Sequence, residues 1–235
     1  MEPEKLTVPI TEQDNVTALI YVAAKRNRIG ATLILGHGAG ANQLSGFMRL
    51  FASGLAARGL DVVTFNFVYM EKGRHVPDKN DKLEACYRAV IDFVKTHTKL
   101  KGNRLAIGGK SMGGRIGSQV AAGTNETVLP EAWDRASIAA VVLLGYPLHP
   151  PGRPDKLRDA HLKDIKASML FVQGSRDTFG TADEVRATIK KHNPKAKLYV
   201  IEGGDHSFKV PKSQGIPQEQ VYETAMDEIA AWLAA

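Results

Sequence analysis

Short, continuously apolar segments alternate with segments of helical periodicity along nearly the whole chain, and this alternation constrains the fold more than any other feature. From residue 31 onward the β-rich segments are apolar at almost every position, as in parallel strands that are covered on both faces. In the first two β-rich segments, apolar and polar residues alternate more, and a short polar segment joins them. This pattern predicts an antiparallel hairpin at one edge of the sheet. The eight segments are residues 5–10, 16–23, 31–36, 61–67, 104–109, 138–145, 168–174 and 197–203.

Apolar side chains between these segments recur at three- and four-residue spacing, which indicates amphipathic helices. Such stripes run from Phe47 to Leu55, from Leu83 to Val94 and from Val221 to Leu233, and a capping-box sequence at 181–184 predicts a helix to about His192. Strand and helix in alternation predict a doubly wound α/β fold with a mostly parallel sheet of about eight strands. We find no repeat or linker, so we expect one domain over residues 1–235.

Composition excludes several classes of protein. The only cysteine, Cys86, lies on an apolar helical stripe, so the chain has no internal disulfide and no cysteine-based zinc site. The first fifteen residues carry charges instead of a signal-peptide core, and the longest apolar stretch, 138–148, is too short to span a bilayer. We therefore expect a cytoplasmic protein without membrane association, either a monomer or a homodimer.

The net charge of +6 and the sequence pI of about 9.3 raise the question of a nucleic-acid partner. The lysines and arginines are scattered, and the sequence has neither a basic arm nor a basic strand interleaved with aromatic residues. We interpret the charge as a solvated surface and expect no nucleic-acid binding.

Residues 105–117, LAIGGKSMGGRIG, are compatible with two chemistries. A phosphate-binding loop requires a glycine five residues before its final glycine, but that position is Arg104, and residues 105–107 are strand-like. A nucleophile elbow requires small residues on both sides of the nucleophile, and Gly109 and Gly113 flank Ser111 in this way. The elbow is the better interpretation.

The segment 36–41, GHGAGA, also satisfies the loose dinucleotide-binding pattern G-x-G-x-x-[GA]. That pattern needs an acidic residue near the end of the following strand to hold the ribose, and the sequence has no carboxylate there before Glu71. We therefore expect no nucleotide cofactor.

Candidate partners of Ser111 follow two later strands, in the chain order serine, acid, histidine. Asp177 follows the segment 168–174, and His206 follows the segment 197–203. Both would lie at the carboxyl edge of the sheet, where loops converge. Asp183, which we assign to the first turn of a helix, is the second choice for the acid, and Asp205 is adjacent to the histidine and poorly placed to orient it.

An oxyanion hole needs two backbone N–H groups. One is expected from Met112, directly after the serine, and the other from the glycine-rich loop 36–42, where Ala39 is the preferred donor. Gly38, Tyr69 and Arg74 are candidate substrate contacts at the carboxyl ends of strands.

Several other polar residues lie near the predicted cleft, and most of them have two interpretations. His37 is expected to shape the oxyanion loop, while His149 and His161 line the pocket or lie on the surface. Arg153 and Arg158, in the segment 146–162, either rim the cleft or pair with Asp155 and Asp159. This segment is long enough for a short flap but not for a large cap domain, so we expect an open site.

Five stretches, 36–42, 65–78, 108–115, 145–162 and 173–180, resemble the α/β-hydrolase superfamily, and the resemblance covers essentially the whole chain. It is closest to small dienelactone-hydrolase-like proteins, in the branch of predicted hydrolases named for a testis-expressed human protein and a subunit of the NSL chromatin complex. The resemblance implies a triad of Ser111, Asp177 and His206, an oxyanion hole at Ala39 and Met112, and no cofactor or metal. Dienelactone hydrolase proper uses a cysteine nucleophile, so its substrate is not transferred to this chain.

The sequence thus predicts a serine hydrolase that cleaves a small carboxylic ester, or a thioester, through an acyl-enzyme intermediate. The alternative is a protein that keeps the hydrolase fold without catalysis and acts as a protein-interaction module.

Overall fold

The structure, a computed structural model, describes residues 2–124 and 137–235. Its eight strands form one sheet in the order β1-β2-β4-β3-β5-β6-β7-β8. The expected doubly wound, mostly parallel sheet is confirmed: all pairings from β4 to β8 are parallel. The strands are β1 (Glu4–Pro9), β2 (Asn15–Tyr21), β3 (Ala31–Gly36), β4 (Asp61–Phe65), β5 (Arg104–Lys110), β6 (Ile138–Leu144), β7 (Ser168–Gly174) and β8 (Lys197–Ile201).

The antiparallel edge is also where the sequence places it. β1 pairs antiparallel with β2 through Glu4 opposite Ile20 and Pro9 opposite Asn15, and β2 pairs antiparallel with β4. Every residue of β3 and β4 is buried, as the continuous apolar runs predict for strands covered on both faces.

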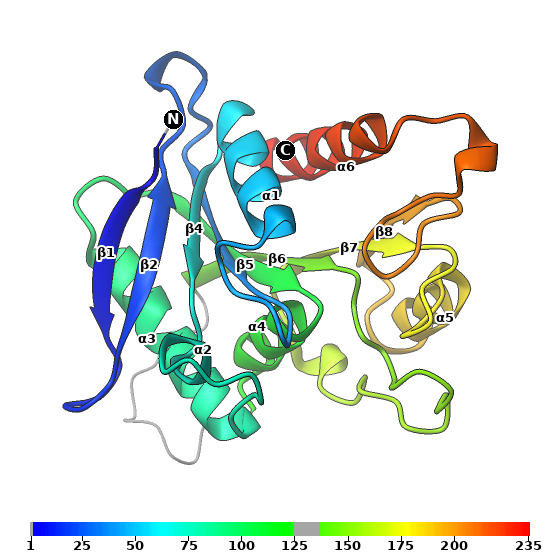
Figure 1. Cartoon of the computed structure of the whole chain (residues 1–235), viewed down its shortest axis with the longest axis horizontal. Helices are drawn as coiled ribbons and strands as arrows, with labels where there is room; N and C mark the ends of the chain where they lie inside the picture. Colours follow the sequence, from blue (N-terminus) through cyan, green and yellow to red (C-terminus); the bar gives the residue numbers. More distant parts are fainter. Residues whose placement is uncertain (1, 125–136) are drawn as a thin grey trace.

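Helices cover both faces of the sheet, as Figure 1 shows. Helices α1 and α6 pack on one face, and α3, α4 and α5 pack on the other. The helices are α1 (Gly46–Ala57), α2 (Val68–Glu71), α3 (Asn80–Thr96), α4 (Met112–Ala122), α5 (Ala182–His192) and α6 (Gln218–Ala234), with short 3₁₀ turns at Lys25–Asn27, Leu162–Asp164 and Lys212–Gln214. None of the helices in the described part of the chain is long and apolar enough to cross a membrane.

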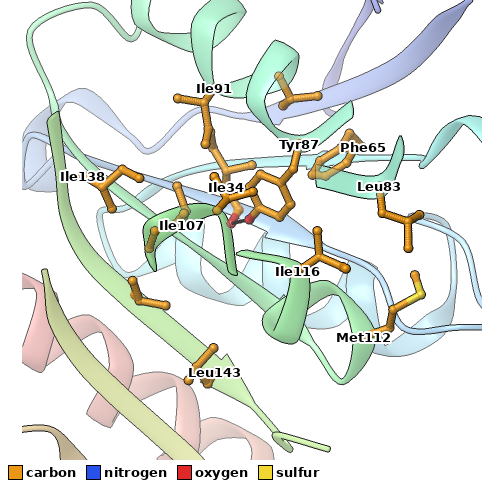
Figure 2. Close-up of a cluster of buried hydrophobic side chains, with 14 of the residues drawn as sticks. Ile34, Phe65, Leu83, Tyr87, Ile91, Ile107, Met112, Ile116, Ile138 and Leu143 are labelled. Carbon is orange, nitrogen blue, oxygen red and sulfur yellow. Dashed lines mark hydrogen bonds between the residues drawn. The ribbon is translucent and has the colours of Figure 1, made fainter. Parts of the chain in front are cut away.

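Tyr87 is the polar centre of the core under α3 and α4 (Figure 2). Its ring is fully buried, and its hydroxyl lies 2.9 Å from the Ile34 carbonyl oxygen, 2.6 Å from the Gly108 carbonyl oxygen and 2.9 Å from the Gly108 N–H. These bonds join α3 to β3 and to β5, at a residue three positions before Ser111. The Tyr87 hydroxyl therefore fixes β5, the strand that leads to Ser111, against β3 and α3.

Helix α4 approaches the end of β3 so closely that only glycine fits. A Cβ on Gly113 would lie 2.1 Å from the carbonyl oxygen of Gly36, and a Cβ on Gly36 would lie 3.0 Å from the Cα of Gly113. Real Cβ atoms essentially never lie closer than 3.0 Å to another heavy atom, so position 113 requires glycine, and position 36 leaves very little room for a side chain. The glycines around Ser111 thus permit helix–strand packing as well as a sharp turn.

The connection between β6 and β7 contains only the short turn at Leu162–Asp164 and inserts no cap domain over the sheet edge. Residues 151–157 of this connection are exposed. The expectation that this segment is too short for a large cap is confirmed.

Candidate active site

Ser111 lies at the junction of β5 and α4 in an unusual backbone conformation. Its φ is 50° and its ψ is −114°, and it is one of two described non-glycine residues with positive φ. Its N–H donates to the carbonyl oxygen of Leu144, at the end of the neighbouring strand β6. Backbone in this region is strained for residues with a Cβ, and such strain clusters at functional sites.

The structure brings Ser111, His206 and Asp177 into one hydrogen-bonded chain. The Ser111 hydroxyl lies 2.8 Å from His206 Nε2, and His206 Nδ1 lies 2.7 Å from Asp177 Oδ2. Because a carboxylate only accepts, Nδ1–H donates to Asp177, which leaves Nε2 to accept the serine proton. Ser111 follows β5, His206 follows β8 and Asp177 follows β7. Because β6 lies between β5 and β7 in the sheet, the hydrogen bonds that link the three side chains pass over the carboxyl end of β6.

Asp177 is fully buried, and its two oxygens have further donors. Oδ1 accepts the N–H of Phe179 at 2.8 Å, and Oδ2 accepts a second hydrogen bond at 2.9 Å from the amide of Gln173. The Gln173 amide also donates to the carbonyl oxygen of Gly180 at 2.7 Å, and its oxygen accepts the N–H of Tyr146 at 2.7 Å. Gln173 was not predicted from the sequence, although a polar side chain near the end of a buried apolar strand is a signal for such a role.

The two other acidic candidates have different roles. Oδ1 of Asp205 accepts the N–H groups of Ser207 and Lys209, at 2.7 and 2.9 Å, and so shapes the loop that carries His206. Asp183 lies in the first turn of α5 and pairs with Arg186. The ring of Phe179 also packs against the His206 imidazole, with 4.3 Å between the two ring centroids.

The candidate oxyanion donors lie beside Ser111. Met112 is the first residue of α4, and the first N–H groups of a helix have no acceptor within the helix. Gly38 and Ala39 belong to the loop after β3 that lines the same pocket as Ser111, and a Cβ on Gly38 would lie 3.7 Å from that of Ser111. These amides and the helix dipole of α4 provide partial positive charge next to the serine.

His37 and Tyr69 support this loop from behind, and neither lines the pocket. His37 is fully buried: Nδ1 lies 2.9 Å from the carbonyl oxygen of Gly38, and Nε2 accepts the N–H of Phe67 at 3.1 Å. Burial lowers the pKa of His37 to about 4, so the ring is neutral and its two nitrogens have fixed roles. Tyr69 is also buried, with its ring centroid 5.9 Å from that of His37, which corrects its expected role as a substrate contact.

A cavity of about 590 Å³ opens at Ser111 and His206. Apolar side chains from α1, α6 and the β7–α5 loop form most of its wall: Phe47, Met48, Leu50, Phe179 and Tyr222. Two cations line it as well. Lys209 is exposed, whereas Lys110 is buried, with 9% of its surface accessible.

The Lys110 side chain crosses beneath the histidine. Its Nζ donates a hydrogen bond of 2.5 Å to the backbone carbonyl oxygen of His206 and lies 5.7 and 5.5 Å from the ring centroids of Phe47 and Phe208. Burial lowers the pKa of the Lys110 ammonium to about 8, against the opposing attraction of Asp177 and Asp205.

Residues 29–234 match the family described as the alpha/beta hydrolase domain. The chain belongs to this α/β-hydrolase family. The match begins just before β3 and ends at the last residue of α6, so it covers all strands of the parallel part of the sheet and every residue of the hydrogen-bonded chain.

Solved structures of other α/β hydrolases share this fold over almost their entire lengths. A dienelactone hydrolase from Anabaena variabilis is 20% identical with a TM-score of 0.68, and 97% of each chain is covered. A serine hydrolase without a lid from Xanthomonas campestris is 18% identical with a TM-score of 0.69, covering 100% of this chain and 97% of its own. The esterase domain of a Rhodothermus marinus protein is 12% identical with a TM-score of 0.70, covering 100% and 98%.

Three arginines that the sequence suggested for the rim of the hydrolase pocket do not line it. Arg74 lies beyond α2, pairs with Asp78 at 2.7 Å and lines a separate hollow with residues 10–14, because α2 turns the chain away from the sheet edge. Arg153 pairs with Asp155 at 3.3 Å on the surface, and Arg158 donates to the carbonyl oxygen of Pro147. Arg153 thus follows the alternative interpretation of a surface ion pair.

His149 and His161 contact the helices next to the pocket. His149 lies 3.3 Å from Glu184 of α5, and His161 lies 2.8 Å from the hydroxyl of Ser118 on α4. Within residues 2–124 and 137–235, no three His, Cys, Asp or Glu side chains gather in a way that would hold a metal ion.

Proposed function

We propose that this α/β hydrolase is a serine hydrolase that cleaves carboxylic esters or thioesters through an acyl-enzyme intermediate. Ser111 attacks the carbonyl carbon, and His206 takes its proton and returns it to the leaving group. Asp177 holds the imidazole in the tautomer that leaves Nε2 free to accept. In the second half of the reaction, His206 activates a water molecule that releases the acid and restores Ser111.

The observation that carries the proposal is the hydrogen-bonded chain from Ser111 through His206 to Asp177, with distances of 2.8 and 2.7 Å. A buried serine in an ordinary tight turn would need neither a strained φ nor a histidine oriented by a carboxylate. The backbone N–H groups of Met112 and Ala39 are the proposed oxyanion donors, because Met112 directly follows Ser111 at the start of α4 and Ala39 lines the pocket that contains Ser111.

The pocket supports a substrate with an apolar acyl group. Phe47, Leu50 and Tyr222 offer aromatic and aliphatic surface beside Ser111, while Arg74 and Arg153 lie outside the pocket. We assign the chain to the small dienelactone-hydrolase-like serine hydrolases on the motifs around Ser111 and the absence of an inserted cap between β6 and β7 in the described residues.

A fluorophosphonate probe tests the proposal directly, because it reacts only with an activated serine. The wild-type protein is expected to be labelled, and Ser111→Ala is expected to lose the label while its thermal unfolding midpoint stays that of a folded protein. Ser118→Ala, which changes a serine hydroxyl bonded to His161, is the matched control and is expected to keep the label. A folded wild-type protein that remains unlabelled would favour a non-catalytic interaction module.

An ester panel of increasing acyl length tests the substrate class. Leu50→Ala is expected to raise KM for butyrate and hexanoate esters about two- to tenfold relative to acetate, because Leu50 lines the pocket. Leu157→Ala, also an exposed leucine but on the β6–β7 connection, is the control that is expected to leave the acyl preference unchanged. Equal effects of the two substitutions would contradict this assignment of the acyl site.

A further inference from the structure

Lys110, in the sequence LAIGGKSMGGRIG, has no part in the proposed reaction. It directly precedes Ser111, but its side chain runs beneath His206 to the backbone of that residue. A lysine this buried loses hydration of its ammonium group, which is costly unless the charge has partners. Its position therefore needs a reason beyond solubility.

The partners of the ammonium group are specific. Nζ donates to the His206 carbonyl oxygen at 2.5 Å, and the rings of Phe47 and Phe208 both lie within the range of cation–π attraction. Phe208 holds a φ of 63°, in the left-handed region, and is fully buried. The loop 205–209 is therefore bent sharply around the point where the lysine contacts it.

Space for the ammonium group comes from a glycine at the end of β6. A Cβ on Gly145 would lie 2.7 Å from Lys110 Nζ and 3.0 Å from the carbonyl oxygen of His206. β6 lies between β5 and β7 in the sheet, so any side chain at this position would separate the residue next to Ser111 from the loop of His206. The absence of a side chain lets Lys110 reach across the end of β6.

We infer that Lys110 is a positioning residue, whose ammonium group fixes the backbone of His206 relative to Ser111 and thereby sets the distance between the histidine and the serine. This inference rests on the proposed hydrolase function and adds a residue to it. Lys110 belongs to the same turn as Ser111 and binds the backbone of His206, so movement of the loop 205–209 away from β5 must break this bond. The bond to Asp177 orients the His206 ring, whereas the bond from Lys110 holds the backbone of the same residue.

Charged groups face the ammonium from two loops. The carboxylates of Asp177, on the β7–α5 loop, and Asp205, on the β8–α6 loop, attract the Lys110 ammonium group. His206 contacts this group through its backbone carbonyl oxygen, and Lys209 lines the same pocket. From α1, the aromatic ring of Phe47 faces the Lys110 ammonium group. Burial outweighs the two carboxylates and lowers the pKa of Lys110 to about 8. As the pH rises through this value the ammonium becomes an amine, and an uncharged amine is the weaker donor.

The test is the pH profile of kcat for a neutral ester, with wild type, Lys110→Met and Lys110→Arg. Wild-type kcat is expected to fall as the pH rises above about 8. Lys110→Met is expected to lower kcat about ten- to a hundredfold at pH 7, with a smaller effect on KM, and to lose the alkaline decline. Lys110→Arg keeps its charge at every pH used, so it is expected to retain more kcat and also to lose the decline.

Lys209→Met is the matched control, because it removes the same charge from the same pocket without a contact to the His206 backbone. Its profile is expected to keep the alkaline decline. Lys110→Met with wild-type kcat, or with the decline intact, would overturn the inference. Thermal unfolding of each variant separates misfolding from misplacement of His206.

Labelling by the fluorophosphonate probe separates failure of this inference from failure of the proposed function. If wild-type Ser111 is not labelled, the hydrolase assignment itself fails. If wild type and Lys110→Met are labelled at the same rate and Ser111→Ala is not, the hydrolase assignment holds and the role of Lys110 fails.

Discussion

Replacing Gln173 by glutamate tests the buried environment of Asp177 most directly. The Gln173 amide nitrogen lies 2.9 Å from Asp177 Oδ2, and both side chains are fully buried. In Gln173→Glu an oxygen takes the place of this donor, so two carboxyl groups face each other. Two unit charges at this separation repel by about 6 kcal/mol at an effective dielectric constant of 20, which is about four pKa units.

The carboxyl pair is therefore expected to retain one proton at neutral pH in the folded state. The pKa of this pair is therefore higher in the folded variant than the value of about 4.3 for a glutamate in the unfolded chain. The free energy of unfolding of the variant keeps its full value below pH 4.3 and falls as the pH rises toward the pKa of the folded pair. The cost relative to wild type is expected to be about 1 kcal/mol at pH 5 and about 4 kcal/mol at pH 7.

Urea unfolding at pH 5, 6, 7 and 8, followed by circular dichroism, measures this cost. Gln173→Met is the control, because it removes the same donor to Asp177 and Gly180, together with the acceptor of the Tyr146 N–H, but introduces no titratable group. Its loss of stability is expected to be the same at each pH. A Gln173→Glu variant whose loss of stability does not change between pH 5 and 7 would refute the contact with Asp177.

Four further predictions concern stability. Tyr87→Phe removes the acceptor of the Gly108 N–H and is expected to cost about 1–3 kcal/mol in urea unfolding, with no change in m. Thr181→Ala removes the capping box of α5 and is expected to cost about 1 kcal/mol, whereas Thr181→Ser is expected to cost less. Gly113→Ala places a Cβ 2.1 Å from the Gly36 oxygen and is expected to prevent folding, whereas Gly46→Ala, with open space around its Cβ, is expected to fold. Burial lowers the pKa of His161 to about 4, so stability is lost as the pH falls from about 6.5 to 4, by up to about 3 kcal/mol, and His161→Gln is expected to reduce this acid loss.

The sheet was predictable because its signal is local. Strands buried on both faces are apolar throughout, and the glycines and polar turns that bound them are visible in the sequence. The predicted segment 61–67 extends two residues past the end of β4, since Phe67 leaves the sheet and donates its N–H to His37. The short helix α2 was missed because four residues are too few to show helical periodicity.

The sequence singled out Ser111, Asp177 and His206, and the structure brings their side chains within hydrogen-bonding distance. Their chain order and their places after strands are local features. Lys110 contacts His206 across 96 residues, so this contact depends on the packing of neighbouring strands. Gln173 lies only four residues before Asp177, but the contact between their side chains depends on how the loop after β7 turns back, which no local pattern indicates. Arg74 was placed at the rim by its position after a strand, a rule that does not foresee the turn that α2 introduces.

The strained backbone at Ser111 lowers the stability of the protein and is useful only if the serine takes part in a reaction. Non-glycine residues in such conformations typically cost about 1–3 kcal/mol each, and the hydrogen bond to His206 offsets part of that. A lineage of this fold that gave up hydrolysis and kept only a binding role would gain stability by replacing the serine with glycine, at little other cost. The residue at this position is therefore an inexpensive indicator, across related sequences, of which members still depend on turnover.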